Sequence, residues 1–282
     1  MNEVRVSEIQ DLLQLAIRED RGGGDVTSEA LIPPEARARA VYRPKHQLVV
    51  AGLGVAQEVA RLCDPDLGFR SLVSDGDSVE SGTVLAELEG SSRSILLVER
   101  TSLNFLQRLS GIASETRRYV DAVVGTRAVI VDTRKTVPGH RLLDKYAVRC
   151  GGGVNHRIGL FDAILIKNNH IEFQEDARSA VRKARRYADP ALGLEIEVRD
   201  LDELMAALDG DPDVILLDNF TPDDTRRAVD RVDHKVALES SGGITLANVR
   251  QYAEAGVDRI SVGALTHSVI ASDINLRVSP LP

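Results

Sequence analysis

Aromatic residues and cysteines are scarce in this sequence. It contains no tryptophan, five phenylalanines, five tyrosines and two cysteines. Because aromatic rings are the platforms on which proteins stack nucleic acid bases, their scarcity argues against nucleic acid binding. Cys63 and Cys150 are too few for a disulfide framework, which favours a reducing, cytoplasmic setting.

Long apolar runs are also missing. No uninterrupted apolar stretch approaches the roughly 18 residues of a membrane-spanning helix, so we expect no membrane span. The first twenty residues are amphipathic and acidic, unlike a signal peptide. With 282 residues, 43% hydrophobic and 28% charged, the chain is long enough for one large or two modest globular domains.

Positive charge is in the minority, but it is concentrated. The chain carries a net charge of −8, yet residues 132–170 hold seven cations against three anions, a net +4. A local positive site in an acidic protein attracts small anions. A nucleic acid-binding surface would be broadly basic instead. The composition therefore indicates a binding site for a small anionic molecule.

The part of the chain after residue 128 alternates between short apolar runs and helical patterns. This rhythm predicts a parallel sheet that closes, or nearly closes, into an α/β barrel of about six strands. The predicted strands are 128–132, 163–167, 194–198, 214–218, 236–240 and 259–262. The predicted helices between them include 176–187, 201–208, 223–230 and 246–255.

The first part of the chain has a different pattern. Alternating residues predict a strand over 37–43, and an apolar pattern predicts a helix over 92–109. Arg100 interrupts the apolar surface of this helix, and spacing alone favours an arginine that extends to solvent. We expect Gly111 to break the helix before a further helix that ends near residue 124.

Polar and charged residues recur where the six predicted barrel strands end, at 132–135, 167–170, 195–197, 218–219, 239–243 and 261–263. In α/β barrels the carboxyl ends of the strands carry function. Glu195 and Glu197 are two apart on one strand and so share a face. A buried carboxylate needs a partner, and the sequence leaves two interpretations of these partners open. One is ion pairing with Arg134 or Lys167; the other is Mg²⁺ or ribose hydroxyls at Glu197 and Asp218.

The last two strand ends are rich in glycine. The segments 240–244 and 261–265 allow backbone N–H groups to face a phosphate, and a helix that follows directly would add a favourable dipole. An ordinary β–α turn is the alternative reading.

Several motifs, taken together, resemble the quinolinate phosphoribosyltransferase family: DTRKTVPG, KYAVRCGGGVNHR, LIKNNH, LEIEV, LLDN, ESSGGI and SVGALTHS, with ERTSLNFLQRLSGIAS upstream. The resemblance covers nearly the whole chain. DTRKT and GGGVNHR at this separation are highly specific. Val137 and His140 depart from the Thr and Leu that are usual in the family, which leaves the detail of that loop open.

The resemblance implies a fold, an assembly and a reaction. The fold would be an N-terminal α/β sandwich over 1–110, on which the tail 270–282 is expected to pack, and an incomplete α/β barrel over 111–269. The assembly would be a homodimer with shared active sites. The reaction would convert quinolinate and phosphoribosyl pyrophosphate, with Mg²⁺, into nicotinate mononucleotide, pyrophosphate and carbon dioxide.

The resemblance also implies roles for individual residues. Quinolinate would be bound by Arg100, Thr133, Arg134, His156 and Arg157, with Arg100 supplied by the dimer partner. Lys135 and Lys167 would face quinolinate or pyrophosphate, and Glu197 and Asp218 would lie near the ribose and hold the metal directly or through water. These four would be the catalytic residues. The sugar phosphate would be bound by Ser241, Gly242, Gly243, Val262, Gly263 and Ala264.

Two alternatives remain. A paralogous phosphoribosyltransferase-like protein of the molybdenum-transport type would share the barrel but lack the intact cluster of Arg134, His156 and Arg157. A phosphosugar-binding barrel without catalysis would not need the acidic pair Glu197 and Asp218.

Overall fold

The chain forms two units, each folded around a sheet of its own. The structure, a computed structural model, describes residues 5–282, except for the side chain of Val6. The first unit contains the described residues up to Arg117 together with Val137–Gly152 and Ser268–Pro282. The second contains Arg118–Thr136 and Gly153–His267.

An antiparallel sheet of order β12-β1-β5-β3 is the base of the first unit. Its strands are β1 (Arg37–Pro44), β3 (Gly68–Ser71), β5 (Ala86–Ser91) and β12 (Ile274–Pro280). The C-terminal strand pairs along β1, where we expected the tail to pack. A short second sheet pairs β2 (Leu48–Val49) with β4 (Ser78–Val79).

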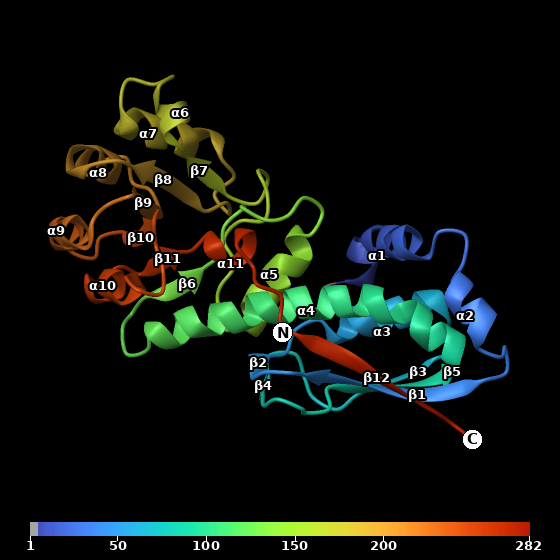
Figure 1. Cartoon of the computed structure of the whole chain (residues 1–282). Coiled ribbons are helices and arrows are strands. Elements are labelled where there is room, and N and C mark those ends of the chain that lie inside the picture. The colour runs from blue at the N-terminus through green and yellow to red at the C-terminus, as the bar shows by residue number, and fades with distance from the viewer. Residues whose placement is uncertain (1–4) are drawn as a thin grey trace. The chain divides into compact units, whose positions relative to one another are not determined.

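The helices of this unit lie on one side of the antiparallel sheet (Figure 1). They are α1 (Val6–Arg21), α2 (Val26–Leu31), α3 (Leu53–Cys63), the long α4 (Ser92–Ala122) and α5 (Arg141–Cys150). A buried hydrogen bond of 2.7 Å between the hydroxyls of Tyr42 on β1 and Ser102 on α4 ties sheet to helix. Apolar residues of β1 and α4 fill the space around it.

The second unit is a six-stranded parallel sheet of order β6-β11-β10-β9-β8-β7. Its strands are β6 (Val129–Val131), β7 (Ile164–Ile166), β8 (Leu194–Val198), β9 (Val214–Asp218), β10 (Ala237–Ser241) and β11 (Arg259–Ser261). The predicted α/β class and the six predicted strands are thus confirmed, with ends that differ by at most one residue. Since β6 and β7 lie at opposite edges and do not pair, the barrel is incomplete.

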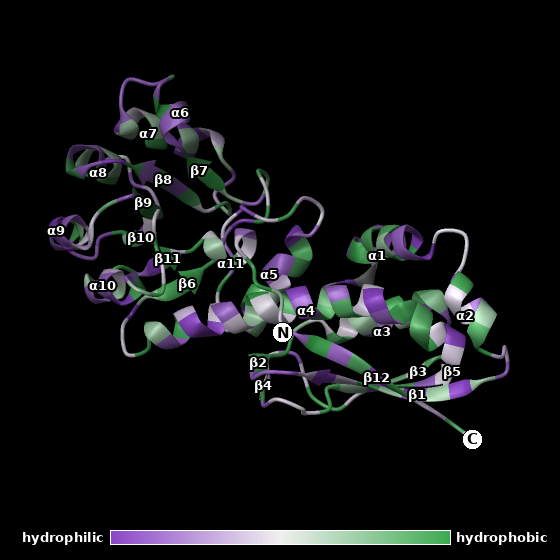
Figure 2. Ribbon diagram, viewed as in Figure 1, coloured by the Kyte–Doolittle hydropathy of each residue, from purple (hydrophilic) through white to green (hydrophobic). Residues whose placement is uncertain are grey.

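Helices pack along the outer side of the parallel sheet (Figure 1). They are α7 (Ala177–Tyr187), α8 (Leu201–Leu208), α9 (Pro222–Val232) and α10 (Val249–Glu254). Two short helices, α6 (Asn168–Ile171) and α11 (Ala264–His267), follow β7 and β11. In Figure 2, β6 and β7 are hydrophobic along their length, whereas β8 carries hydrophilic residues. An inner strand of the sheet, β8, therefore carries two glutamates among its apolar residues.

Two expectations about the boundary between the units need correction. The predicted boundary at residue 110 lies inside α4, which continues through Gly111 to Ala122 without a break. The segment Val137–Gly152, which we assigned to the barrel, belongs to the first unit. A salt bridge of 2.8 Å between Arg108 on α4 and the fully buried Asp144 on α5 helps to hold it there.

Gly111 is explained by packing rather than by helix termination. A Cβ atom at this position would lie 2.3 Å from the carbonyl oxygen of Ile270 and 3.2 Å from the Cα of Ala271. Glycine therefore lets the C-terminal segment of the same unit approach the helix closely.

We predict that Gly111→Ala destabilises the protein by about 1–3 kcal/mol, because overpacking against a backbone outweighs the helical preference for alanine. Gly54→Ala in α3 is the matched control, since a Cβ there meets no atom within 4 Å. Chemical unfolding of both variants measures the effect. Equal stability of the two would show that the close approach to residues 270–271 does not constrain position 111.

Candidate active site

The inner face of the parallel sheet carries carboxylates. The strand register aligns Glu197 on β8 with Leu216 on β9, and Leu216 with Glu239 on β10. It also aligns Asp218 with Ser241. Aligned residues of parallel neighbours point to the same side of a sheet, so these side chains share one face. The opposite face packs on the helices and is apolar, with fully buried Ile196, Ile215 and Leu217.

Two arginines lie close together in the second unit. Burial is the main cause that lowers the pKa of Arg157, and the positive charge of Arg134 lowers it further, whereas Glu195 and Asp162 oppose the shift. Arg157 also donates from Nη1 to the carbonyl oxygen of Ala163 at 3.2 Å. Two guanidinium groups in a partly buried setting form a receptor for carboxylates.

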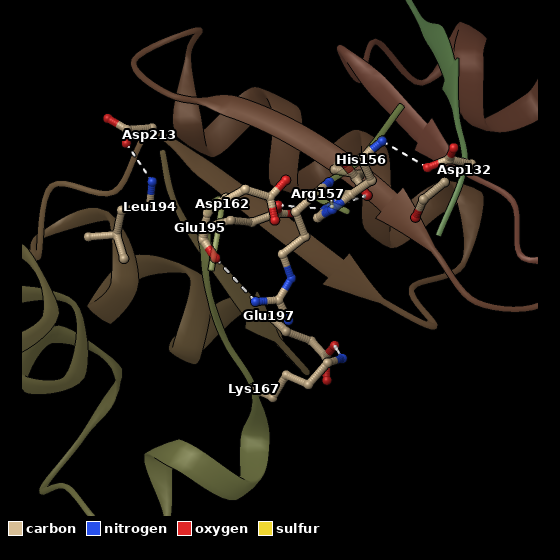
Figure 3. A network of polar contacts seen from close by, with 12 residues as sticks. Asp132, His156, Arg157, Asp162, Lys167, Leu194, Glu195, Glu197 and Asp213 are labelled. Carbon is tan, nitrogen blue, oxygen red and sulfur yellow. Dashed lines mark hydrogen bonds and ion pairs between the residues drawn. The ribbon is translucent and has the colours of Figure 1, made fainter. Parts of the chain in front are cut away.

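Side-chain acceptors hold the segment that presents Arg157. Asp132, which is fully buried, accepts from Nδ2 of Asn155 at 2.6 Å and from the backbone N–H of His156 at 2.8 Å (Figure 3). Asp162 accepts from the backbone N–H groups of residues 158 and 159 at 2.7 and 2.8 Å. The conformation of residues 155–159 thus depends on two carboxylates rather than on a strand ladder.

His156 faces two glutamates. Its Nε2 lies 2.9 Å from Oε2 of Glu195 and 3.9 Å from Oε1 of Glu239. The side chains of Glu195 and Glu239 are 8% and 0% exposed. Burial, and after it the charge of Glu195, raises the pKa of Glu239 from its ordinary value of 4.5 to about 7. These glutamates were not among the predicted site residues.

Lysines lie beside both the acidic and the glycine-rich strand ends. Nζ of Lys167 forms an ion pair of 2.6 Å with Oε2 of Glu197 (Figure 3), which confirms that reading of Glu197. Lys135 runs past the end of β11, where a Cβ at Gly263 would lie 3.0 Å from its Cδ. The Thr133 hydroxyl accepts from the backbone N–H of Lys135 at 3.0 Å. The predicted residues Thr133, Lys135 and Gly263 therefore belong to one neighbourhood.

The turn after β10 requires glycine. Gly242 has a φ of +93°, and a Cβ there would lie 2.1 Å from Oδ1 of Asn219. Asn219 in turn donates its backbone N–H to the carbonyl of Ser241 at 2.8 Å. The ends of β9 and β10 are thus packed backbone against backbone, which leaves Gly243 open to solvent with no atom within 4 Å of a built Cβ.

The helix expected after this turn begins three residues later than predicted, so its N-terminus does not directly follow the glycines. The helix α10 begins at Val249, after a turn in which Thr245 donates its backbone N–H to Oδ1 of Asn248 at 2.7 Å. The helix after β11, α11, spans only Ala264–His267. Only the backbone N–H groups of the glycine-rich turns remain for a phosphate.

Other predicted residues lie in the first unit. Arg100 is exposed on α4. Val137 is 40% exposed, and the ring of His140 stacks on Phe105 with centroids 5.8 Å apart. Of the seven cations in the basic stretch, Arg141, Lys145 and Arg149 belong to α5. Lys145 is buried there, so the stretch does not form a single positive patch within one unit.

Comparisons with known proteins match the whole architecture. The family model of the quinolinate phosphoribosyl transferase N-terminal domain matches residues 25–110, and that of the C-terminal domain matches residues 112–277. The chain belongs to the quinolinate phosphoribosyltransferase family.

Relatives of this family align along nearly their full length. The nicotinate-nucleotide pyrophosphorylase [carboxylating] of Mycobacterium leprae is 45% identical over 98% of this chain and 99% of its own. The probable enzyme of the same name from Bacillus subtilis is 40% identical over 96% of this chain and 94% of its own. The crystal structure of NadC from Streptococcus pyogenes has a TM-score of 0.96 at 37% identity and covers 100% of both chains.

Sequence reasoning noted Asp132, Glu195 and Glu239 at strand ends but gave them no role in the site. A signal was available for Glu239, since an acidic residue inside the apolar run of a central strand needs a reason. The contact between His156, Glu195 and Glu239 was not predictable, because it depends on how a loop folds back over strands β8 and β10.

We predict that Glu239→Gln stabilises the protein more at pH 7 than at pH 4.5. The unfolded carboxyl ionises near its ordinary pKa of 4.5, whereas the folded carboxyl keeps its proton up to about 7. Stability of the parent protein therefore falls across this window by ~1.4 kcal/mol per pH unit, or ~3 kcal/mol in all, and glutamine removes that loss.

The measurement is the free energy of unfolding of the parent protein and of Glu239→Gln at several pH values between 4.5 and 7. The other carboxyl groups titrate alike in both proteins, so their contributions cancel when the two free energies are subtracted. A difference that stays constant with pH would contradict the raised pKa.

Proposed function

We propose that this protein transfers the phosphoribosyl group of phosphoribosyl pyrophosphate to quinolinate, with loss of carbon dioxide, to give nicotinate mononucleotide and pyrophosphate in NAD biosynthesis. One observation carries the proposal. The second unit has a cationic pole, Arg134 and Arg157, and an acidic pole, Glu197 and Asp218. A dicarboxylate fits the first pole, and a ribose with a metal-bound diphosphate fits the second.

The cationic pole suits quinolinate because guanidinium groups bind carboxylates in a bidentate way. Two carboxylates on neighbouring ring carbons need at least two such groups, and Arg134 and Arg157 supply them. Thr133 and His156 lie next to these arginines in sequence and complete the binding residues. The cation Lys135 extends towards the end of β11, between this pole and the phosphate turns.

The acidic pole suits Mg²⁺. Carboxylates are hard oxygen donors, and Mg²⁺ in proteins takes one or two of them together with substrate phosphates and waters. Glu197 and Asp218 would hold the ion directly or through water. Because Lys167 is paired with Glu197, the lysine and the ion would share that carboxylate. When bound, Mg²⁺ would neutralise charge on the pyrophosphate.

The sugar phosphate suits the glycine-rich ends of β10 and β11. Ser241, Gly242 and Gly243 follow β10, and Val262, Gly263 and Ala264 follow β11. Their backbone N–H groups can face a phosphate without desolvating a side chain. In this proposal the ribose would lie between the phosphate turns and the acidic pole.

No protein nucleophile is needed for this reaction. The pyridine nitrogen of quinolinate attacks the anomeric carbon of the ribose as the bond to pyrophosphate breaks. The protein must hold two anionic substrates together, and Lys135 and Lys167 stabilise the charge on the departing pyrophosphate. The product pyridinium then stabilises the electron pair that stays on the ring carbon when the carboxylate beside it leaves as carbon dioxide. That carbon takes up a proton from water to complete the product.

Assembly and location complete the proposal. We place the protein in the cytoplasm, since the two cysteines are free thiols. Among the described residues, no helix has the length and apolar character needed to cross a membrane. We propose a homodimer in which the exposed Arg100 of one subunit enters the active site of the other.

Arg157→Ala and Asp218→Asn should affect different substrates. We predict that Arg157→Ala loses ~2–5 kcal/mol of quinolinate binding, the usual cost of truncating a buried charge pair. Asp218→Asn should weaken binding of phosphoribosyl pyrophosphate with Mg²⁺ more than binding of quinolinate. Calorimetric titration of each substrate, with turnover measured alongside, separates the two effects.

Arg226→Ala is the control, because this arginine lies on the surface of α9 in an exposed pair with Asp223. It should behave like the parent protein. Wild-type quinolinate affinity in Arg157→Ala would refute its role, and loss of quinolinate rather than phosphoribosyl pyrophosphate in Asp218→Asn would mean that the poles are reversed.

A subunit-mixing experiment tests the shared site. Arg100→Ala and Arg157→Ala should each be inactive. In a mixed dimer, one site receives Arg157 from its own subunit and Arg100 from the partner, and so is whole. After random exchange half of the dimers are mixed, so we predict that about a quarter of all sites recover activity.

If Arg100 served its own subunit, every site in the mixture would lack one of the two arginines. Mixing would then restore no activity above that of the separate variants.

A further inference from the structure

One backbone hydrogen bond fixes the protonation of His156. The backbone N–H of Arg157 lies 2.7 Å from Nδ1 of His156. An amide N–H can only donate, so Nδ1 must be an unprotonated acceptor. The imidazole is therefore neutral and carries its proton on Nε2, which donates to Oε2 of Glu195 at 2.9 Å.

The buried carboxyl groups around His156 are consistent with a neutral imidazole. Glu195 is the acceptor for Nε2–H, and its Oε1 has no hydrogen-bond partner among the residues that the structure describes. Neither carboxyl oxygen of the fully buried Glu239 has a hydrogen-bond partner among the described residues, although the Ser261 hydroxyl lies nearby. Burial, and after it the neighbouring Glu195, raises the pKa of Glu239, which disfavours two negative charges in one buried space.

We propose that Glu195 is a positioning residue for Arg157. Glu195 holds Nε2–H of His156, which keeps Nδ1 free to accept the backbone N–H of Arg157. Together with Asp132, which accepts the backbone N–H of His156, this chain of contacts fixes the backbone on both sides of His156. The direction of the Arg157 side chain, which binds quinolinate in the proposed function, follows from that backbone. The inference rests on the proposed function for its kinetic readout only.

A bound cation is the competing explanation for the same cluster. One ligand atom from each of His156, Glu195 and Glu239 lies within 4.8 Å of the others, close enough for a metal ion. A metal at Nε2 would have to replace the proton that the contact with Arg157 requires there. The hydrogen-bond pattern thus favours a proton over a cation.

Kinetics of two substitutions test the proposal. Glu195→Ala removes the acceptor, and we expect the KM for quinolinate to rise about tenfold or more, the effect of losing a hydrogen bond to a charged group. The KM for phosphoribosyl pyrophosphate and kcat should stay within about threefold of the parent values, the scatter of an ordinary kinetic comparison. Glu195→Gln keeps an acceptor oxygen for Nε2–H and should restore most of the affinity.

Glu254→Ala is the matched control, since this glutamate forms an exposed pair with Arg250 on α10. Two kinetic results would overturn the proposal. An unchanged quinolinate KM in Glu195→Ala would show that Glu195 positions nothing. Equal damage in Glu195→Gln and Glu195→Ala would mean that the charge of Glu195 acts on Arg157 directly.

Nitrogen NMR of histidine-labelled wild-type protein gives a readout that needs neither turnover nor a folded variant. We expect a pyrrole-type signal for Nε2 and a pyridine-type signal for Nδ1 of His156, unchanged when Zn²⁺ or a chelator is added. A proton on Nδ1, or a metal-dependent shift of these signals, would overturn the proposal. If the wild-type protein made no nicotinate mononucleotide, the proposed function would fail, while the NMR result would still decide the positioning role.

Discussion

Burial of carboxylates inside a parallel sheet is the constraint on which the site depends. Register makes every second residue of neighbouring strands point to the same side. Here that rule collects Glu195, Glu197, Asp218 and Glu239 on the inner face of the six strands, while apolar residues take the face under the helices. A buried carboxylate is costly unless it is paired or protonated. Three of them meet that demand differently: Glu195 with His156, Glu197 with Lys167, and Glu239 by retaining its proton.

The carboxylates near the arginines also shape the loop that carries Arg157. Because Glu195 accepts from an imidazole N–H, it fixes a neighbouring loop without forming a close ion pair with Arg157. Asp132 and Asp162 are likewise occupied by amide donors of residues 155–159. Carboxylates near the cationic pole thus hold the loop in shape through amide donors. The backbone that carries Arg157 is fixed by these contacts.

Periodicity predicted the architecture of the second unit, because short buried strands and amphipathic helices leave strong local patterns. It failed at Gly111, since the close approach of residues 270–271 is a long-range contact that no local pattern records. It also failed for α5, whose return to the first unit depends on the pairing of Arg108 with Asp144. The family motifs located His156 and Arg157 and included Glu239 in ESSGGI. They gave Glu239 no role, because its approach to His156 depends on the strand register. The roles of the site residues stay predictions.

The most direct test follows the carboxylate that is lost. Purified protein is supplied with phosphoribosyl pyrophosphate, Mg²⁺ and quinolinate carrying a carbon label in the carboxylate beside the ring nitrogen. The account predicts one labelled carbon dioxide and one pyrophosphate for each nicotinate mononucleotide formed. Binding of phosphoribosyl pyrophosphate without product, or a mononucleotide that keeps the label, would contradict it.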